Sequence, residues 1–265
     1  MQKLATKIVE KPWGKCGIDP RFRVDGDRKV GEIWFEPPPG RELDVMVKYL
    51  FTTERLSIQV HPDDATAQER GYPRGKDECW IVLDVDEEAE LAVGTHQEVE
   101  PGEVIEAARS GQIVGMMDWK RPSKGDFIYN PAGTIHALGP GLTILEIQQA
   151  VDLTYRLYDY GRPRELHLEE AAEVVDPHPH HHQLDTRIEG HSKLLVDGPH
   201  FGVAWCVGEP PELPRTMRDV QLLPIDQPVG IVKPGECALI DEGAARTLMC
   251  SGTYVLAWST TDREG

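Results

Sequence analysis

The sequence lacks several features that would assign it to common classes of protein. It has no apolar run long enough to cross a membrane as a helix, so we expect no membrane partner. Its first residues are polar and charged, unlike the apolar core of a secretory signal, and we therefore expect a cytoplasmic protein. The five cysteines are scattered and form no Cys-x-x-Cys pair, which favours reduced thiols over a disulfide framework.

Basic residues are scarce as well. The 28 lysines and arginines are outnumbered by 45 aspartates and glutamates, which gives a formal net charge of −17 at pH 7. Nucleic acids bind to dense basic surfaces, so this balance argues against a nucleic-acid partner. A small phosphorylated ligand needs only a local basic pocket and remains compatible with it. At 265 residues the chain can form one large domain or two small ones.

Short strand-like runs separated by turn residues dominate the chain. The 21 prolines and 25 glycines are spread along it, as in proteins of many short strands. We expect strands at 44–51, 55–61, 78–85, 91–94, 126–130, 134–138, 142–148, 154–158, 200–207, 219–224, 229–232, 237–240, 247–249 and 253–258. Helical patterns are limited to 65–70, 102–119 (one helix or two) and 165–175. The sequence therefore predicts a mainly β protein, a barrel or a jelly roll.

The composition changes after Val175, where a stretch rich in histidine and proline begins. We predict a first domain at 1–175, a linker at 176–192 and a small C-terminal β-lobe at 193–265. Histidines 178 and 180–182 are a second candidate metal site. A proline-broken polar linker usually lacks fixed ligand geometry, however, so adventitious metal capture is the favoured interpretation of these histidines.

Three motifs together indicate a metal site. Gln59 and His61 are two residues apart in a strand-like run and therefore point to the same face. Glu78 opens another strand after a glycine turn, and His136 follows a proline–glycine turn much later in the chain. A Gln/His/Glu/His set suits Zn²⁺ or another borderline divalent ion, with one position left for water or substrate. Each histidine alone could be an ordinary hydrogen-bonded core residue, but the combination favours a metal.

The order of these motifs resembles that of the cupins, which are jelly-roll barrels. Four sequence motifs closely resemble those of type I mannose-6-phosphate isomerases, particularly their compact bacterial form. They are S-I-Q-V-H-P-D-D, G-K-D-E-C-W, N-P-A-G-T-I-H-A-L and L-E-I-Q-Q…T-Y-R-L-Y-D-Y. The resemblance is strong from Trp13 to Ala172 and only general from Val196 onward. It implies a cupin-type jelly-roll barrel that carries the metal site, with a few helices and a second, smaller C-terminal β-lobe.

The resemblance also implies roles for individual residues. It places an active-site arginine at Arg156 and a substrate-binding lysine at Lys76. The plain alternatives are a solvated turn lysine at Lys76 and a structural ion pair of Arg156 with Asp152 or Asp159. It implies one zinc ion per chain, or another divalent ion. The implied metal ligands are Gln59, His61, Glu78 and His136.

The activity implied by the resemblance is the interconversion of mannose 6-phosphate and fructose 6-phosphate, by a monomer or a small homo-oligomer. One alternative is an isomerase of another sugar or sugar phosphate on the same fold. Another is a non-catalytic sugar-binding cupin, although a binding module has no evident need for Lys76 and Arg156 beside the metal set. The residues alone do not identify the general base. We expect Trp13, Trp34 and Trp80 to be core or rim residues rather than sugar-stacking platforms.

Overall fold

The computed structural model describes residues 1–260, which form eighteen strands, five α-helices and one 3-10 turn. The strands are β1 (Gln2–Lys3), β2 (Ala5–Lys15), β3 (Val30–Glu36), β4 (Val45–Phe51), β5 (Ile58–Val60), β6 (Glu78–Val85), β7 (Leu91–Thr95), β8 (Met117–Lys120), β9 (Asp126–Asn130), β10 (His136–Leu138), β11 (Leu142–Gln149), β12 (Tyr155–Tyr158), β13 (Thr186–Arg187), β14 (Lys193–Asp197), β15 (Phe201–Val207), β16 (Arg218–Pro224), β17 (Ala238–Ile240) and β18 (Thr253–Ser259). The helices are α1 (Asp64–Glu69), α2 (Pro101–Ser110), α3 (Ile113–Met116), α4 (Leu168–Ala172) and α5 (Glu242–Arg246). No helix among the described residues is both long and apolar enough to span a membrane.

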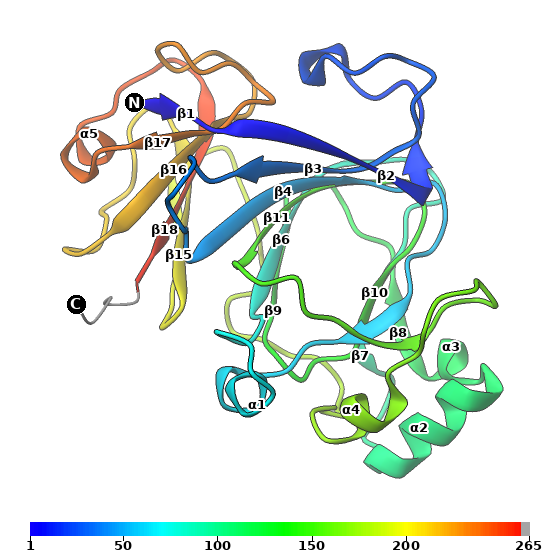
Figure 1. The fold of residues 1–265 in the computed structure, drawn as a ribbon. Helices are drawn as coiled ribbons and strands as arrows, with labels where there is room; N and C mark the ends of the chain where they lie inside the picture. The colour runs from blue at the N-terminus through cyan, green and yellow to red at the C-terminus, as the bar shows by residue number, and fades with distance from the viewer. Residues whose placement is uncertain (261–265) are drawn as a thin grey trace.

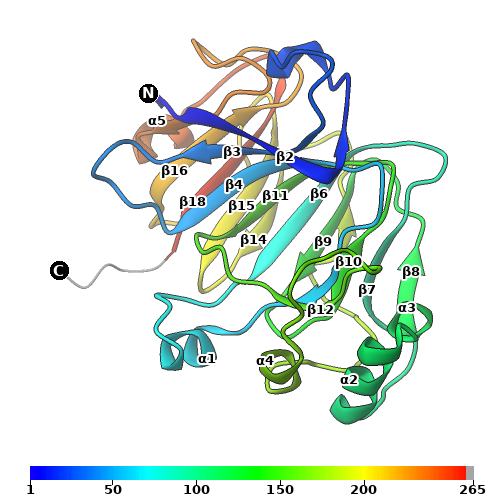
Figure 2. The same ribbon diagram turned by 45° about the vertical axis from the view of Figure 1, so that its right-hand side comes forward.

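The strands form three sheets that lie in layers (Figures 1 and 2). The central sheet has seven strands in the order β13-β9-β6-β11-β4-β3-β2. A five-stranded sheet, β12-β5-β10-β7-β8, closes the barrel on one side, and α2 to α4 cover its outer face (Figure 1). A six-stranded sheet, β1-β17-β16-β18-β15-β14, packs on the other side of the central sheet. The expected mainly β fold with a smaller C-terminal β-lobe is confirmed.

The sequence of β6 shows why the central sheet lies between two layers. Its side chains alternate, so that Cys79 and Ile81 join the core shared with the six-stranded sheet, while Trp80 packs in the barrel interior. A strand that is buried on both faces reads as a nearly continuous apolar run. Glu78, at the start of this run, has the same parity as Trp80 and is carried to the barrel side. The alternation thus places one carboxylate inside the barrel.

Most expected elements are present, and the exceptions have local causes. The segment 229–232 is a tight turn closed by a bridge between Val229 and Val232, with Gly230 at a φ of +59°. No strand forms at 247–249. The last residues of the expected 102–119 helix belong instead to strand β8. Strands β1, β2, β3, β13 and β14 were not predicted. In β2, Pro12 and Gly14 interrupt the apolar alternation.

The histidine-rich stretch after Val175 packs against the barrel. The backbone N–H of Asp176 donates to the Gly133 carbonyl at 2.8 Å, and that of Thr95 donates to the His178 carbonyl at 3.2 Å. At its end, β13 pairs with β9 in the central sheet. At the other end of the chain, β1 pairs with β17 in the six-stranded sheet. The division at 175 and 193 therefore stays a prediction, and hydrogen bonds cross both proposed boundaries.

We expect Gly94→Ala to destabilise the protein by about 3 kcal/mol. Gly94 has a φ of +73°, and an added Cβ would lie 2.5 Å from the backbone nitrogen of His180. The methyl group would therefore push the histidine-rich stretch away from β7. Denaturant unfolding measures the change, with Gly26→Ala as control because nothing lies within 4 Å of a Cβ there. Equal stability of the two variants would contradict the prediction.

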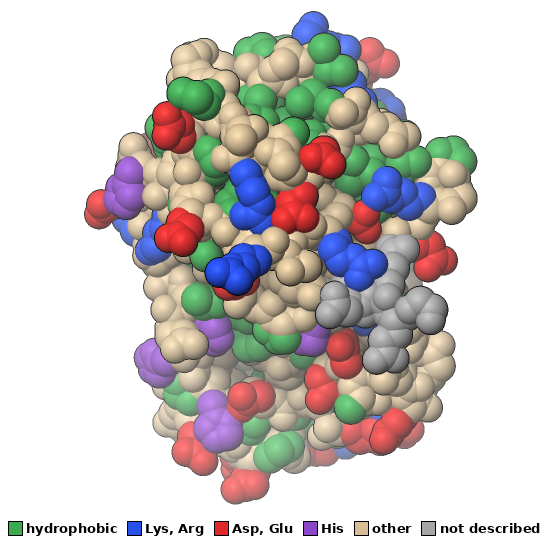
Figure 3. Space-filling view, turned by 90° about the vertical axis from the view of Figure 1, so that its left-hand side faces the viewer, with side chains coloured by type: hydrophobic (Ala, Val, Ile, Leu, Met, Phe, Trp, Pro, Cys, Tyr) green, Lys and Arg blue, Asp and Glu red, His purple; other side chains and the backbone are tan. Residues whose placement is uncertain are grey.

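On the face shown in Figure 3, lysine and arginine side chains lie next to aspartates and glutamates. The two signs are interspersed over the upper and middle part of this face, whereas aspartates and glutamates predominate over its lower part (Figure 3).

Candidate metal centre

Three buried side chains that could hold a metal ion meet inside the barrel. His61 directly follows β5, while Glu78 and His136 open β6 and β10. One ligand atom from each of these residues lies within 4.8 Å of the others. His136 is the cross-strand partner of Gln59, and the Gln59 Nε2 lies 3.2 Å from the His136 Nε2. The structure therefore brings together all four side chains that the sequence pointed to as ligands.

Both histidines are oriented by backbone carbonyls. The Nδ1 of His61 lies 2.8 Å from the Leu153 carbonyl oxygen, and that of His136 lies 2.9 Å from the Thr134 carbonyl oxygen. Because a carbonyl can only accept, each Nδ1 carries the proton and each Nε2 presents a lone pair. Burial is the largest cause of a lowered pKa at both histidines. The neutral imidazoles that metals bind are thus the favoured forms.

The third group, Glu78, lies between the two imidazoles. Its carboxylate oxygens are 3.5 Å from the His61 Nε2 and 3.3 Å from the His136 Nε2. Burial alone would raise the pKa of Glu78, but the positive charge of Lys76 holds it below its usual range. The side-chain amide of Asn130 donates a hydrogen bond to the Oε1 of Glu78 at 3.1 Å. Glu78 is therefore an oriented carboxylate in a dry site.

Lys76 supplies the positive charge at this point. Its Nζ lies 3.0 Å from the His61 Nε2 and 2.5 Å from the Glu78 Oε2, and the residue is 5% exposed. The alternative of a solvated turn lysine is therefore wrong. The ammonium contacts the same donor atoms that a metal ion would use, which shows that the cluster suits a cation. An ion bound to these atoms and the ammonium in this position exclude one another.

Gln59 fits the ligand set through its amide oxygen. Its Oε1 accepts a hydrogen bond from the Ser57 hydroxyl at 3.1 Å, and its Nε2 faces His136. The two ends of a glutamine amide are assigned from the hydrogen-bond network, and rotation exchanges them. Ligation by the oxygen requires the amide turned over. With that rotation, two imidazoles, one carboxylate and one amide form a set that suits a borderline divalent ion.

A second pair of charged residues lies beside the cluster and was missed by the sequence analysis. Glu146 and Lys48 are cross-strand partners in β11 and β4, with 2.9 Å between Oε1 and Nζ. Lys76 Nζ is 3.7 Å from the same carboxylate, and the Trp80 indole N–H donates to it at 3.1 Å. Burial, followed by the charge of Glu78, raises the pKa of Glu146. A lone charged residue within each apolar strand was the signal that could have identified them.

Arg156 lies apart from this network. It is the cross-strand partner of Gln59, yet among the described residues its guanidinium has no hydrogen bond or ion pair with the metal cluster. Its Nη1 donates to the Glu165 carbonyl at 2.6 Å, and its Nε is buried without a partner in the described part of the chain. It lines a cavity of about 460 Å³ together with residues of the segments that follow α1 and precede α4.

The alternative ion pairs of Arg156 are not present in residues 1–260. Asp159 is buried and is instead held by Arg164, at 2.6 Å from both of its carboxylate oxygens, and by Arg162 at 3.1 Å. Arg156 shows no ion pair with Asp152 either. The guanidinium is thus available to the cavity that it lines.

The histidines after Val175 do not converge on one point. His180 pairs with Asp185 at 2.9 Å, His182 stacks on Tyr129 with 4.7 Å between ring centroids, and His178 contacts Asp176 and Glu98. Across residues 1–260, the only cluster of histidine, cysteine and acidic groups with ligand spacing is the one in the barrel. The structure therefore gives no support to a second metal site here.

No family model matches the chain. A probable mannose-6-phosphate isomerase of Bacillus subtilis, GmuF, is 40% identical over 185 residues, which are 64% of this chain and 58% of that protein. The solved mannose 6-phosphate isomerase from Bacillus subtilis has a TM-score of 0.76 at 26% identity and covers 97% of this chain and 98% of its own. A mannose 6-phosphate isomerase solved with zinc bound has a TM-score of 0.69 at 13% identity, covers 98% of this chain and 99% of its own, and shows likeness of fold alone.

The sequence match and the structural match differ in extent. The aligned segment spans about three fifths of GmuF, whereas the superposed fold spans nearly all of the solved Bacillus subtilis enzyme. Together they confirm the resemblance to mannose-6-phosphate isomerases and the cupin-type barrel that the motifs predicted.

Proposed function

We propose that this chain is a zinc-dependent aldose–ketose isomerase that interconverts mannose 6-phosphate and fructose 6-phosphate in the cytoplasm. The observation that carries the proposal is the buried cluster of His61, Glu78 and His136 in a chain that is 40% identical to a probable mannose-6-phosphate isomerase over its aligned part. Two neutral imidazoles and an ionised carboxylate are suited to holding a divalent cation, and such a cation, with the two nearby ammonium groups, would stabilise negative charge on a sugar.

The ligands of the ion would be Gln59, His61, Glu78 and His136. A bound Zn²⁺ would polarise the sugar oxygens as a Lewis acid. Because the ion and the Lys76 ammonium compete for the same donor atoms, loading the site frees that ammonium to meet the substrate. This supports the role of Lys76 as a substrate-binding residue.

The reaction moves a proton between C1 and C2 of the sugar, and it needs a group that can accept and return it. Glu146 has a carboxylate beside the cluster, and burial raises its pKa above the ordinary value for a glutamate, which favours proton uptake by this group. The ammonium groups of Lys48 and Lys76 lie 2.9 and 3.7 Å from that carboxylate. They would keep positive charge near the sugar oxygens on which negative charge develops. We assign Glu146 as the candidate general base.

Arg156 is proposed to act on the charged part of the substrate. A planar guanidinium can bind a phosphate or an enediolate through two parallel hydrogen bonds. The unpartnered Nε of Arg156 and its position on the wall of the 460 Å³ cavity support this role.

Zinc-loaded protein is expected to convert mannose 6-phosphate to fructose 6-phosphate in a coupled assay. Chelation should abolish the rate, and added Zn²⁺ should restore it, because the cluster then regains its cation. Absence of turnover on mannose 6-phosphate would refute the assignment. In that case, turnover of another member of a sugar-phosphate panel would identify a different isomerase, and binding without any turnover would identify a sugar-binding cupin.

A further inference from the structure

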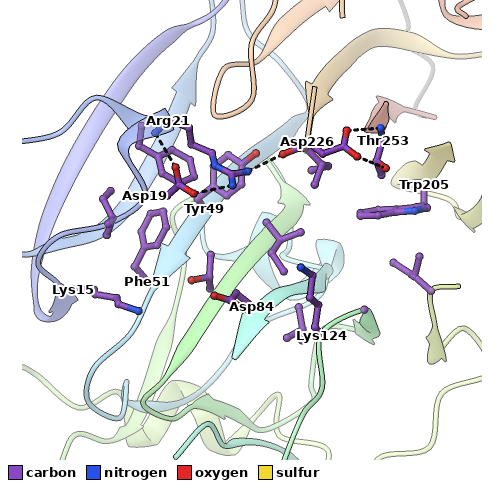
Figure 4. A pocket seen from close by; sticks show the side chains of 18 of the residues that line it. Lys15, Asp19, Arg21, Tyr49, Phe51, Asp84, Lys124, Trp205, Asp226 and Thr253 are labelled. Atoms are coloured by element: carbon purple, nitrogen blue, oxygen red, sulfur yellow. Dashed lines mark hydrogen bonds and ion pairs between the residues drawn. The ribbon is translucent and has the colours of Figure 1, made fainter. Parts of the chain in front are cut away.

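A second cavity of about 720 Å³ lies between the central sheet and the six-stranded sheet (Figure 4). Val82, Leu83 and Asp84, near the end of β6, line it, whereas Glu78 opens the same strand. Six residues of extended strand span roughly 20 Å, so the cavity and the metal centre are well separated. None of the proposed metal ligands lines it.

Aromatic rings form the walls of this cavity from two sheets. Tyr49 and Phe51 are stacked neighbours on β4, and the Phe22 ring packs edge-on against both, at centroid distances of 4.8 and 5.0 Å. Trp205 comes from β15 in the six-stranded sheet and is only half-buried (Figure 4). Tyr49 and Phe51 are themselves buried, so the partly exposed rings of Phe22 and Trp205 offer the accessible aromatic surface on the two sides.

Three charged side chains from separate elements extend into the same space. Lys15 ends β2, Asp84 belongs to β6, and Lys124 lies in the turn before β9 (Figure 4). Within residues 1–260, none of these three side chains has a hydrogen bond or an ion pair. They are therefore available to a ligand.

Three other charged groups of the cavity, Asp19, Arg21 and Asp226, are already engaged. Arg21 pairs with Asp19 at 2.8 Å and donates to the Ile225 carbonyl at 2.7 Å. Asp226 accepts hydrogen bonds from the backbone N–H and the hydroxyl of Thr253 (Figure 4). These contacts join the two sheets at the edge of the cavity and hold its shape.

The balance of charge selects the kind of ligand. Three basic residues of the lining are matched by four acidic ones, Asp19, Asp84, Glu189 and Asp226. A phosphate or another strong anion would lie among carboxylates, so it is disfavoured. Hydroxyl groups can both donate and accept, and they suit ammonium groups mixed with a carboxylate. A sugar ring adds apolar C–H faces that pack on aromatic rings.

We propose that this cavity binds an unphosphorylated carbohydrate of one or two rings. Trp205 and the partly exposed ring of Phe22 contact the faces of the sugar, and the Lys15, Asp84 and Lys124 side chains bind its hydroxyl groups. The volume lies within the usual range of small-ligand pockets. The site is independent of the metal centre and of the isomerase activity proposed for it.

The test is a titration of the whole chain with mannose, glucose, maltose, cellobiose and mannobiose, followed by calorimetry and saturation-transfer NMR. Saturable binding of at least one sugar is expected. Asp84→Asn and Trp205→Ala should each weaken it by about tenfold, the effect of losing one good contact. Asp27→Asn, the same change at an exposed aspartate outside the cavity, should leave it unchanged.

The variant His136→Ala separates this site from the metal centre. Binding should persist in it, and Asp84→Asn should keep the parent's turnover of mannose 6-phosphate. No saturable binding of any of the five sugars would overturn the proposal. So would binding that is lost in His136→Ala and kept in Asp84→Asn, because the sugar would then be at the metal centre. Asp84 is exposed, so its variant stays informative even if Trp205→Ala fails to fold.

Discussion

Replacement of His136 by alanine is expected to remove the bound ion and abolish isomerisation while the β-sheet spectrum is retained. The His136 Nε2 lies 3.3 Å from Glu78 and 3.2 Å from Gln59, so its loss leaves the ligand set incomplete at its centre. The barrel itself is held by separate apolar clusters that do not include this side chain. Metal analysis after dialysis, the coupled assay and circular dichroism measure the three outcomes.

Histidines outside the barrel could mask this result by binding metal themselves. The measurement is therefore made with His178, His180, His181 and His182 replaced in both the parent and the variant. His191→Ala is a matched control, since that histidine is exposed and lies outside the cluster. Metal content that is undiminished in His136→Ala would eliminate the proposed site.

Substitution of Arg156 by lysine is expected to lower kcat by ~10²-fold or more, which is the effect of losing one preorganised donor. Lysine keeps the positive charge but not the planar fork, so the change separates geometry from charge. Metal content and thermal stability should stay near those of the parent, because Asp159 is already held by Arg162 and Arg164. Steady-state kinetics and thermal unfolding measure these quantities.

The control for this variant is Arg109→Lys, at an exposed arginine of α2 that pairs only with Glu106 among the described residues. It should alter neither kcat nor stability. A rise in KM with an unchanged kcat would make Arg156 a substrate-binding group, and unfolding of the variant would make it structural. Either result would remove its proposed catalytic role.

Local patterns were sufficient to predict most elements and the side chains that meet in the candidate metal cluster. Strand parity placed Gln59 and His61 on one face, and the structure carries both toward His136. Side chains of a strand alternate between its two faces, and this alternation depends only on adjacent residues, so the tertiary fold does not alter it. The same reasoning failed for β2, where Pro12 and Gly14 interrupt the alternation, and for 247–249, where α5 ends before an irregular segment.

Contacts between distant residues could not be predicted in this way. The pairing of Lys48 with Glu146 depends on the register of β4 against β11, which joins positions about a hundred residues apart in the sequence. The contact of Lys76 with His61 likewise depends on how the segment before β6 meets the end of β5. Such distances are set by sheet pairing and packing, which local propensity does not encode.

The sequence by itself determined the mainly β class, the ligand types and the resemblance to mannose-6-phosphate isomerases, because these depend on short-range alternation and on motif words. Only the tertiary structure decided which charges surround the cluster, that the histidines after Val175 form no set with ligand spacing among the described residues, and that Arg156 lines a cavity. It also created the cavity beside Trp205, whose walls come from two different sheets. Burial raises or lowers the pKa of a group and fixes its partners only after layers have packed, so these features exist only in the folded chain.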